Sequence, residues 1–308
     1  MDGCWRRGFV CIGNAKAVNW INRARFGTRV AASRGVNATK ITRQSRSNLA
    51  LAFISLGPER RRDISVFYAF CRLVDDIVDS SELDVEGKRL ALAQWRSALR
   101  GPLADEPSIA PEVRRLIDKY SLRPEMLDEI IAGVEMDLTV RRYESFEQLR
   151  VYCYRVASAV GLVSIEIFDY RSPACKEYAV QLGLALQMTN IIRDVETDLR
   201  DDRIYLPLQD LARFDYSEAD LQDRQYDERF LRLMQFEAAR AREFFDAAAK
   251  LLPPQDRRSM VAAEIMASIY RSLLRRIERD GFRVFEKQYR LGRLEKARRI
   301  ARELLKSL

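Results

Sequence analysis

Two stretches of the sequence decide the fold and the chemistry of this chain. The first reads YAFCRLVDDIVD, residues 68–79, and the second reads QMTNIIRDVETDLRDDRIYLP, residues 187–207. In both, apolar residues recur at helical spacing around a set of acids. We therefore predict two largely buried helices, each carrying a stripe of carboxylates.

The first stretch places its polar residues on one helix face. They stand at positions i, i+4, i+7 and i+11, which are Tyr68, Arg72, Asp75 and Asp79. Carboxylates four residues apart repel each other, and the repulsion grows when they are partly buried. We therefore expect a cation to compensate the charge of this face.

The second stretch repeats the arrangement far along the chain. Its oxygen-bearing residues stand at i, i+3, i+7 and i+11, which are Gln187, Asn190, Asp194 and Asp198. A solvated helix face, with salt bridges to the nearby arginines, is the simplest structural explanation of one such stripe. It does not explain why amides are in register with the acids, or why the pattern occurs twice.

Cation chemistry favours a functional explanation. The chain contains no histidine, which excludes imidazole metal ligands and Ser-His or Cys-His catalysis. Mg²⁺ binds hard oxygens, and it typically takes one or two carboxylates together with water and substrate phosphate oxygens. Two facing aspartate clusters would bind a diphosphate with several Mg²⁺ ions, and arginines would complete its neutralisation.

The rest of the sequence predicts an all-α protein. Its 308 residues include only 13 Gly and 9 Pro, show no repeat period, and contain no obvious interdomain linker. We predict one helical domain over 47–308, preceded by a basic extension over 1–46 that is a targeting segment, a tail or an overextended start. The predicted helices cover 50–56, 58–79, 83–99, 112–120, 124–139, 146–169, 174–200, a short segment after Pro207, 227–251, 255–279 and 283–306.

The net charge of +8 is concentrated at the two ends of the chain. The five cysteines form no C-x-x-C pair, which fits a reducing compartment, and no stretch approaches about 18 consecutive apolar residues. The basic C-terminal helix either rests on an anionic membrane or is simply solvated. We expect a cytoplasmic protein, free or peripheral on the inner membrane, with no nucleic-acid partner and no obligate protein partner.

The two stretches, in this order, resemble two of the three recognisable blocks of the squalene/phytoene synthase family. The block between them is matched by YCYRVASAVG at 152–161, and RRYESFEQL at 141–149 fits the segment that leads into it. The resemblance runs from about 47 to 285. It implies a single-domain isoprenoid synthase-type bundle with a central cavity, and a prenyltransferase that couples two allylic diphosphates head to head (1′–1).

The resemblance also implies roles for individual residues. Two or three Mg²⁺ ions would bind with the diphosphate at Asp75, Asp76, Asp79, Asn190, Asp194 and Asp198. Substrate would contact Ser47, Tyr68, Arg72, Gln187, Asn190 and Arg193. Catalysis would depend on Asp75, Asp79, Asp194 and Asp198, with released diphosphate or a tyrosine such as Tyr154 or Tyr270 as proton acceptor.

Three readings of the function remain at this point. The block at 152–161, with Arg155 before Val156, looks most like bacterial enzymes that make presqualene diphosphate from two farnesyl diphosphates in hopanoid synthesis. The alternative is a phytoene synthase that joins two geranylgeranyl diphosphates. The third is a non-catalytic assembly factor, although all five aspartates are retained. Without a G-x-G-x-x-G signature, we expect no requirement for NADPH.

Overall fold

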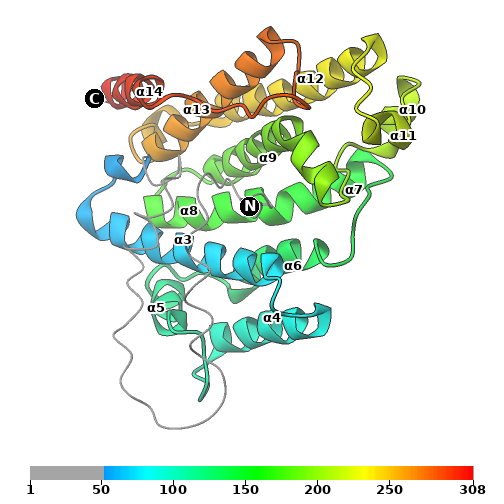
Figure 1. The fold of residues 1–308 in the computed structure, drawn as a ribbon. Helices are drawn as coiled ribbons and strands as arrows, with labels where there is room; N and C mark the ends of the chain where they lie inside the picture. The colour runs from blue at the N-terminus through cyan, green and yellow to red at the C-terminus, as the bar shows by residue number, and fades with distance from the viewer. Residues whose placement is uncertain (1–51, 308) are drawn as a thin grey trace.

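The computed structural model describes residues 52–307, which form an all-α bundle (Figure 1). Within this range the backbone forms no strand, and only a single bridge joins Arg142 to Ile204. Short turns η2 (Phe53–Ser55) and η4 (Pro254–Asp256) accompany the helices. The helices are α3 (Pro58–Asp79), α4 (Val85–Arg100), α5 (Ala110–Lys119), α6 (Pro124–Met136), α7 (Phe146–Cys153), η3 (Tyr154–Ser158), α8 (Ala159–Phe168), α9 (Ala174–Arg200), α10 (Leu208–Arg213), α11 (Glu218–Gln222), α12 (Glu228–Leu251), α13 (Val261–Arg279) and α14 (Arg293–Lys306).

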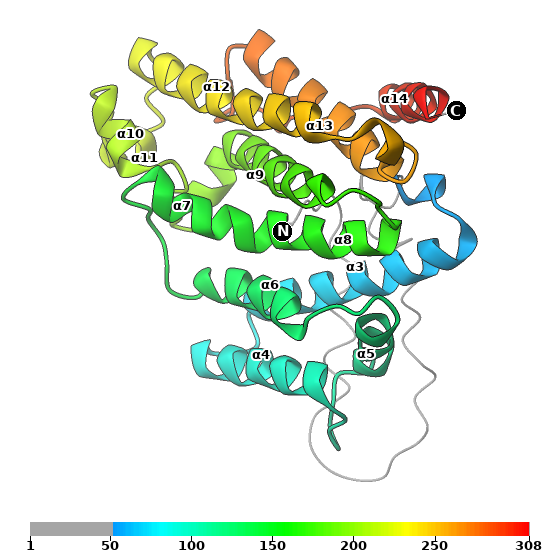
Figure 2. The ribbon, with the colours of Figure 1, turned by 180° about the vertical axis from the view of Figure 1, so that it is seen from behind.

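The helices are stacked in successive layers. In Figures 1 and 2, α4 and α5 lie at one edge, α3 and α6 come next, α7, α8 and α9 occupy the middle, and α12 and α13 form the opposite side. Helix α9 packs against α8, α12 and α13. Its buried apolar residues therefore lie at the centre of the core, as the sequence predicted.

Local signals explain where the main helices begin. Helix α3 starts with Pro58 in its first turn, followed by Glu59, and both are favourable there because proline lacks the unsatisfied N–H and the acid meets the positive end of the helix dipole. Helix α12 is capped by the Asp227 carboxylate, which accepts hydrogen bonds from the backbone N–H groups of Arg229 and Phe230.

The helix predicted over 146–169 is interrupted. Its middle, η3, is a π-helical segment wedged between α6 and α9. Glycines permit this close packing, since a Cβ at Gly183 would lie 2.5 Å from Ser158 Cα and one at Gly133 would lie 2.8 Å from Val156 Cγ1. Such π segments often occur at functional sites.

The same stretch, Phe146–Phe168, has the length and composition of a membrane span, and no other described helix does. Its most apolar window is 56% buried inside the bundle. Packing of this stretch inside the bundle therefore explains its apolar composition.

Two predicted helix starts are wrong. The helix expected from 255 starts at Val261, because η4 intervenes and its Asp256 carboxylate accepts hydrogen bonds from the backbone N–H groups of Arg171 and Ser172. The helix expected over 283–306 starts only at Arg293. The preceding segment follows left-handed residues at 281 and 282 and forms only a short turn, in which Lys287 N–H donates to the Arg283 carbonyl at 3.0 Å. The Tyr289 hydroxyl also holds this segment, because it accepts a hydrogen bond from Arg283 N–H and donates one to Asp280.

Candidate active site

The two aspartate stripes lie at the same end of the molecule. Helices α3 and α9 run in the same direction on either side of α8, so their C-terminal halves lie at one end of the bundle (Figures 1 and 2). On α9, Gln187, Asn190 and Asp198 are buried, and on α3 Asp75 is only 2% exposed. These polar stripes therefore face the inside of the protein, as the spacing of their residues suggested.

In the first cluster an arginine pairs with two of the acids. Arg72 donates a hydrogen bond of 3.1 Å to Asp75 Oδ2 and one of 2.5 Å to Asp76 Oδ1. Burial, followed by repulsion from Asp79, nevertheless raises the pKa of Asp75 well above its ordinary value. Burial also raises the pKa of Asp76. The Arg72 charge therefore offsets only part of the effect of burial on these two carboxylates.

In the second cluster Arg193 pairs with Asp194, and its Nε donates a 2.8 Å hydrogen bond to Asp194 Oδ1. Burial opposes the charge of Arg193, but Asp194 and the buried Tyr270 hold the pKa of its guanidinium above the ordinary value. Burial, followed by repulsion from Asp194, raises the pKa of Asp198 well above its usual range. This cluster also carries more negative charge than its surroundings compensate.

A further buried acid, Asp137, lies between the two clusters and was not predicted from the sequence as a site residue. It follows the last turn of α6 and is 2% exposed. Its Oδ1 accepts a 2.7 Å hydrogen bond from the Tyr205 hydroxyl, and its Oδ2 accepts one of 3.1 Å from the Tyr152 hydroxyl. Arg203, also 2% exposed, lies 3.6 Å from Asp137 Oδ1 and donates a hydrogen bond to its backbone carbonyl.

Asp137 connects the clusters electrostatically. Its charge contributes to the raised pKa of Asp75 and to that of Asp198, after burial and the nearer carboxylates. The Arg203 charge lowers the pKa of Asp198 and so opposes the effect of burial. The pKa of Arg203 is in turn raised in part by Asp79 on α3. Carboxylates from α3, α6 and α9 therefore share one buried site.

No single sequence signal identified this third acid. Asp137 follows the last turn of α6 as an isolated acid, without a spaced partner on its own helix. Tyr152 lies within the block at 152–161, whose predicted site tyrosine was Tyr154. Tertiary packing brings Asp137 together with Tyr152 and Tyr205. The two tyrosine rings also stack on each other, with their centroids 5.1 Å apart.

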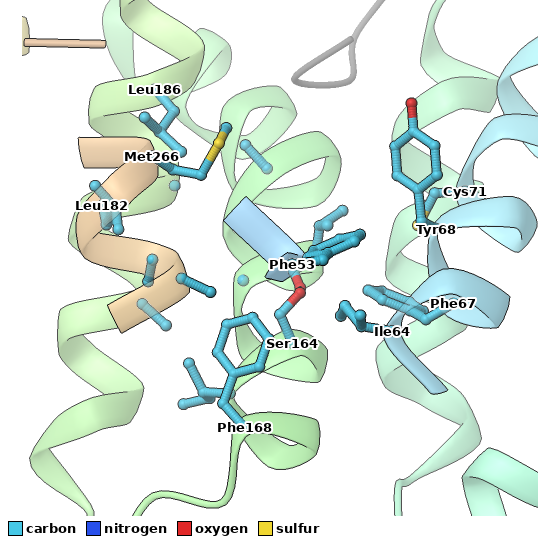
Figure 3. A pocket seen from close by; sticks show the side chains of 18 of the residues that line it. Phe53, Ile64, Phe67, Tyr68, Cys71, Ser164, Phe168, Leu182, Leu186 and Met266 are labelled. Carbon is cyan, nitrogen blue, oxygen red and sulfur yellow. The ribbon is translucent and has the colours of Figure 1, made fainter. Parts of the chain in front are cut away.

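An apolar chamber lies beside the clusters, between α3, α8, α9 and α13 (Figure 3). It encloses about 810 Å³ of space between atoms, including its opening to solvent. Tyr68 on α3 and Leu186 on α9 line it, so the helix turns that follow them carry the aspartates. Figure 3 shows the Tyr68 hydroxyl pointing away from the apolar rings of Phe67 and Phe168. The arrangement suits a molecule with a charged head and a long apolar tail.

The remaining predicted site residues, two tyrosines and a serine, do not all lie at the site. Tyr270 is fully buried beside Arg193. Tyr154 is half-buried in η3 and is not one of the residues that line the chamber. Ser47 lies outside the described residues, so its role stays a prediction, as does the basic extension over 1–46.

The donor set fits magnesium. Asn190 Nδ2 donates to Gln187 Oε1 at 3.3 Å, but the buried Asn190 Oδ1 has no hydrogen-bond partner in the part of the chain that the structure describes. The described cysteine and acidic side chains form no group of three that is ready to hold a metal ion. Mg²⁺ is typically held by one or two carboxylates together with water and substrate oxygens, and the unpartnered amide oxygen of Asn190 would supply a further oxygen ligand.

Buried facing carboxylates, arginines and an apolar chamber define a site for an apolar molecule with an anionic head. The family model described as squalene/phytoene synthase matches residues 42–295. The chain therefore belongs to the squalene/phytoene synthase family, and it is a prenyltransferase.

Curated relatives support this assignment, and solved structures share the fold. The chain is 38% identical to a phytoene synthase of Arthrospira platensis, over 74% of this chain and 79% of that one. It is 34% identical to a 15-cis-phytoene synthase of Synechocystis, over 81% and 78%. The fold is similar to that of a dehydrosqualene synthase, with a TM-score of 0.75 and 23% identity over 88% and 96% of the chains. A squalene synthase from Alicyclobacillus acidocaldarius gives a TM-score of 0.69 at 24% identity, over 80% and 93%.

Proposed function

We propose that this protein joins two C20 prenyl diphosphates head to head to form phytoene, without NADPH. The observation that carries head-to-head coupling is the pair of buried aspartate clusters beside the apolar chamber. The length of the substrate rests on the relatives, because those at 33–38% identity are phytoene synthases. They favour this alternative over the presqualene diphosphate reading that the sequence suggested first.

Magnesium would be held by Asp75, Asp76 and Asp79 on α3 and by Asn190, Asp194 and Asp198 on α9. When bound, the ions would neutralise the diphosphate head and the charge that develops as it leaves. They would also relieve the repulsion that raises the pKa values of Asp75 and Asp198. A non-catalytic role is disfavoured, because none of these acids has been lost.

The protein's own groups would orient the substrates. Arg72 and Arg193 already lie against the aspartates and would turn toward the diphosphate oxygens, where bidentate contacts stabilise the leaving group. The chamber would exclude water from the allylic cation while the double bond of the second chain attacks it. This attack closes a cyclopropane ring and releases one proton, and we assign its acceptance to released diphosphate or to Tyr270, which lies beside Arg193. Departure of the second diphosphate, rearrangement of the carbon skeleton and loss of a second proton would then complete phytoene.

The Tyr152 hydroxyl would serve a different purpose. Burial, followed by the Asp137 charge, raises the pKa of this hydroxyl well above its ordinary value, so it stays neutral. It lies 3.1 Å from Asp137 Oδ2 and 3.4 Å from the Tyr205 hydroxyl, and it can donate to either. We propose that it helps to hold the Asp137 carboxylate in place between the two metal sites. The protein would act in the cytoplasm and needs no protein partner for this reaction.

The test is incubation of the purified protein with Mg²⁺ and either C15 or C20 diphosphate, with and without NADPH, followed by identification of the products. Phytoene from the C20 substrate, without NADPH, is expected. Presqualene diphosphate from the C15 substrate, with no product from C20, would replace the proposal. No product from either substrate would support the non-catalytic reading.

A further inference from the structure

We propose that the outer face of α14, together with the neighbouring arginines of α13, is a docking surface for an anionic lipid bilayer. Helix α14 lies at the edge of the molecule and packs against α13 (Figures 1 and 2). This inference does not depend on which prenyl diphosphate the active site accepts.

The solvent face of α14 combines leucines with arginines. Leu294 and Leu305 are 78% and 70% exposed, more than any other large apolar residue of the described chain. Helical spacing puts both on the side opposite Glu303, which is buried. Around these two leucines the outer face also contains the exposed residues Ala297, Arg298, Ala301 and Arg302, and the exposed Arg293 and Lys306 flank it.

Next to this face several guanidinium groups crowd together. Arg275 on α13 has its pKa lowered by burial and then by the charges of Arg299, Arg279, Arg271 and Arg302. Arg271 pairs with Asp246 at 2.8 Å, and Arg299 approaches Glu295 at 3.7 Å. No described carboxylate lies within ion-pair distance of Arg275, Arg279 or Arg302. The cluster therefore has excess positive charge that a partner can neutralise.

The combination of exposed leucines and arginines on this face indicates which kind of partner it binds. A free phosphate or a nucleic acid would use the arginines but would leave Leu294 and Leu305 exposed. At a bilayer surface, leucines enter the boundary of the acyl chains, while the long arginine side chains extend to the lipid phosphates. An anionic bilayer therefore satisfies both parts of the face at once.

The position of the surface suits an enzyme with apolar substrates. Tyr178 lines the chamber and donates a 2.7 Å hydrogen bond to Glu264 on α13. The pKa of Glu264 is raised, chiefly by burial. Glu303 and Lys306, near the end of α14, are close enough to contribute to this pKa. Glu264 therefore contacts the chamber wall through Tyr178 and is influenced electrostatically by the end of α14.

The test is sedimentation of the full chain with vesicles of phosphatidylcholine alone and of phosphatidylcholine and phosphatidylglycerol in equal parts. We expect binding to the anionic vesicles only. Removing two arginines in Arg298→Gln/Arg302→Gln should weaken that binding by about tenfold or more, because each basic group near such a surface contributes about one tenfold step or somewhat less. The control, Arg89→Gln/Arg115→Gln, removes the same charge from exposed sites on α4 and α5 and should bind like the wild type.

A second variant, Leu294→Ser/Leu305→Ser, keeps the charge and should also weaken binding. Retained helical circular dichroism would show that both α14 variants are folded, as expected for substitutions on an exposed face. Equal binding to neutral and anionic vesicles, or equal loss in the control and α14 arginine variants, would overturn the proposal. So would binding that excess inorganic phosphate abolishes while the leucine variant binds normally, because the site would then recognise phosphate alone.

Discussion

The Tyr205 hydroxyl donates a 2.7 Å hydrogen bond to Asp137 Oδ1, and both residues are buried between the aspartate clusters of α3 and α9. With Arg203 and Tyr152, they form a fixed polar group at the point where the two clusters meet. The network keeps a negative charge in the centre of a site that already contains an excess of carboxylates. This charge is therefore expected to matter for stability and for cation binding alike.

Asp137→Asn should destabilise the protein by about 3 kcal/mol, because it leaves the buried Arg203 without its charged partner. Urea denaturation followed by circular dichroism measures the change. Asp169→Asn is the control, since Asp169 is 69% exposed and its left-handed backbone is one that asparagine tolerates. Equal stability of the two variants would show that the Asp137 network is not important for folding.

Gly183→Ala should destabilise the protein by about 1–3 kcal/mol, as overpacking of a close contact does. The added methyl group would lie 2.5 Å from Ser158 Cα, so α9 and η3 must separate. Gly101→Ala is the matched control, because a Cβ there meets nothing within 4 Å and its backbone is extended. Thermal denaturation of both variants compares them, and an unchanged melting temperature for Gly183→Ala would contradict the tight packing.

Glu237 on α12 should make stability depend on pH. Burial raises the pKa of this carboxyl to about 8, whereas its value in the unfolded chain is near 4.5. Between these values the folded state keeps a proton that the unfolded state releases, so this contribution is complete at low pH and is lost as the pH rises through about 8. The slope is at most about 1.4 kcal/mol per pH unit for one group.

Urea denaturation at several pH values between about 5 and 9 measures this dependence, and Glu237→Gln isolates the contribution of the side chain. We expect a flatter pH profile for the variant than for the wild type. Profiles of identical slope would show that Glu237 does not carry a raised pKa.

Magnesium binding should strengthen with rising pH. The pKa values of Asp75 and Asp198 are raised, chiefly by burial, and an ion must displace the protons that these groups hold. Calorimetric titration with Mg²⁺ and a non-reactive diphosphate, in buffers of different ionisation enthalpy, counts the released protons. Proton release that increases as the pH falls is expected, and none at any pH would contradict the raised pKa values.

The sequence predicted the elements of this site better than their connections. The stripes of α3 and α9 were visible because helical spacing alone brings their residues together. The place of Asp137 in the site could not be seen in the sequence, because its partners Tyr152 and Tyr205 come from distant segments and meet it only through packing. The interruption at η3 was missed for the same reason, since it depends on close contacts with Gly133 and Gly183 on neighbouring helices. The late start of α14 followed from a left-handed turn at 281–282 that helical periodicity does not reveal.

The most direct test of the central claim is calorimetric binding of a non-reactive prenyl diphosphate analogue, with and without Mg²⁺, to the wild type, Asp75→Asn and Asp194→Asn. Asp223→Asn, at an exposed position after α11, is the control. We predict that the wild type and the control bind only when Mg²⁺ is present, and that each cluster variant binds at least about tenfold more weakly. Binding without Mg²⁺, or an undiminished affinity in either cluster variant, would contradict a site formed by both aspartate clusters.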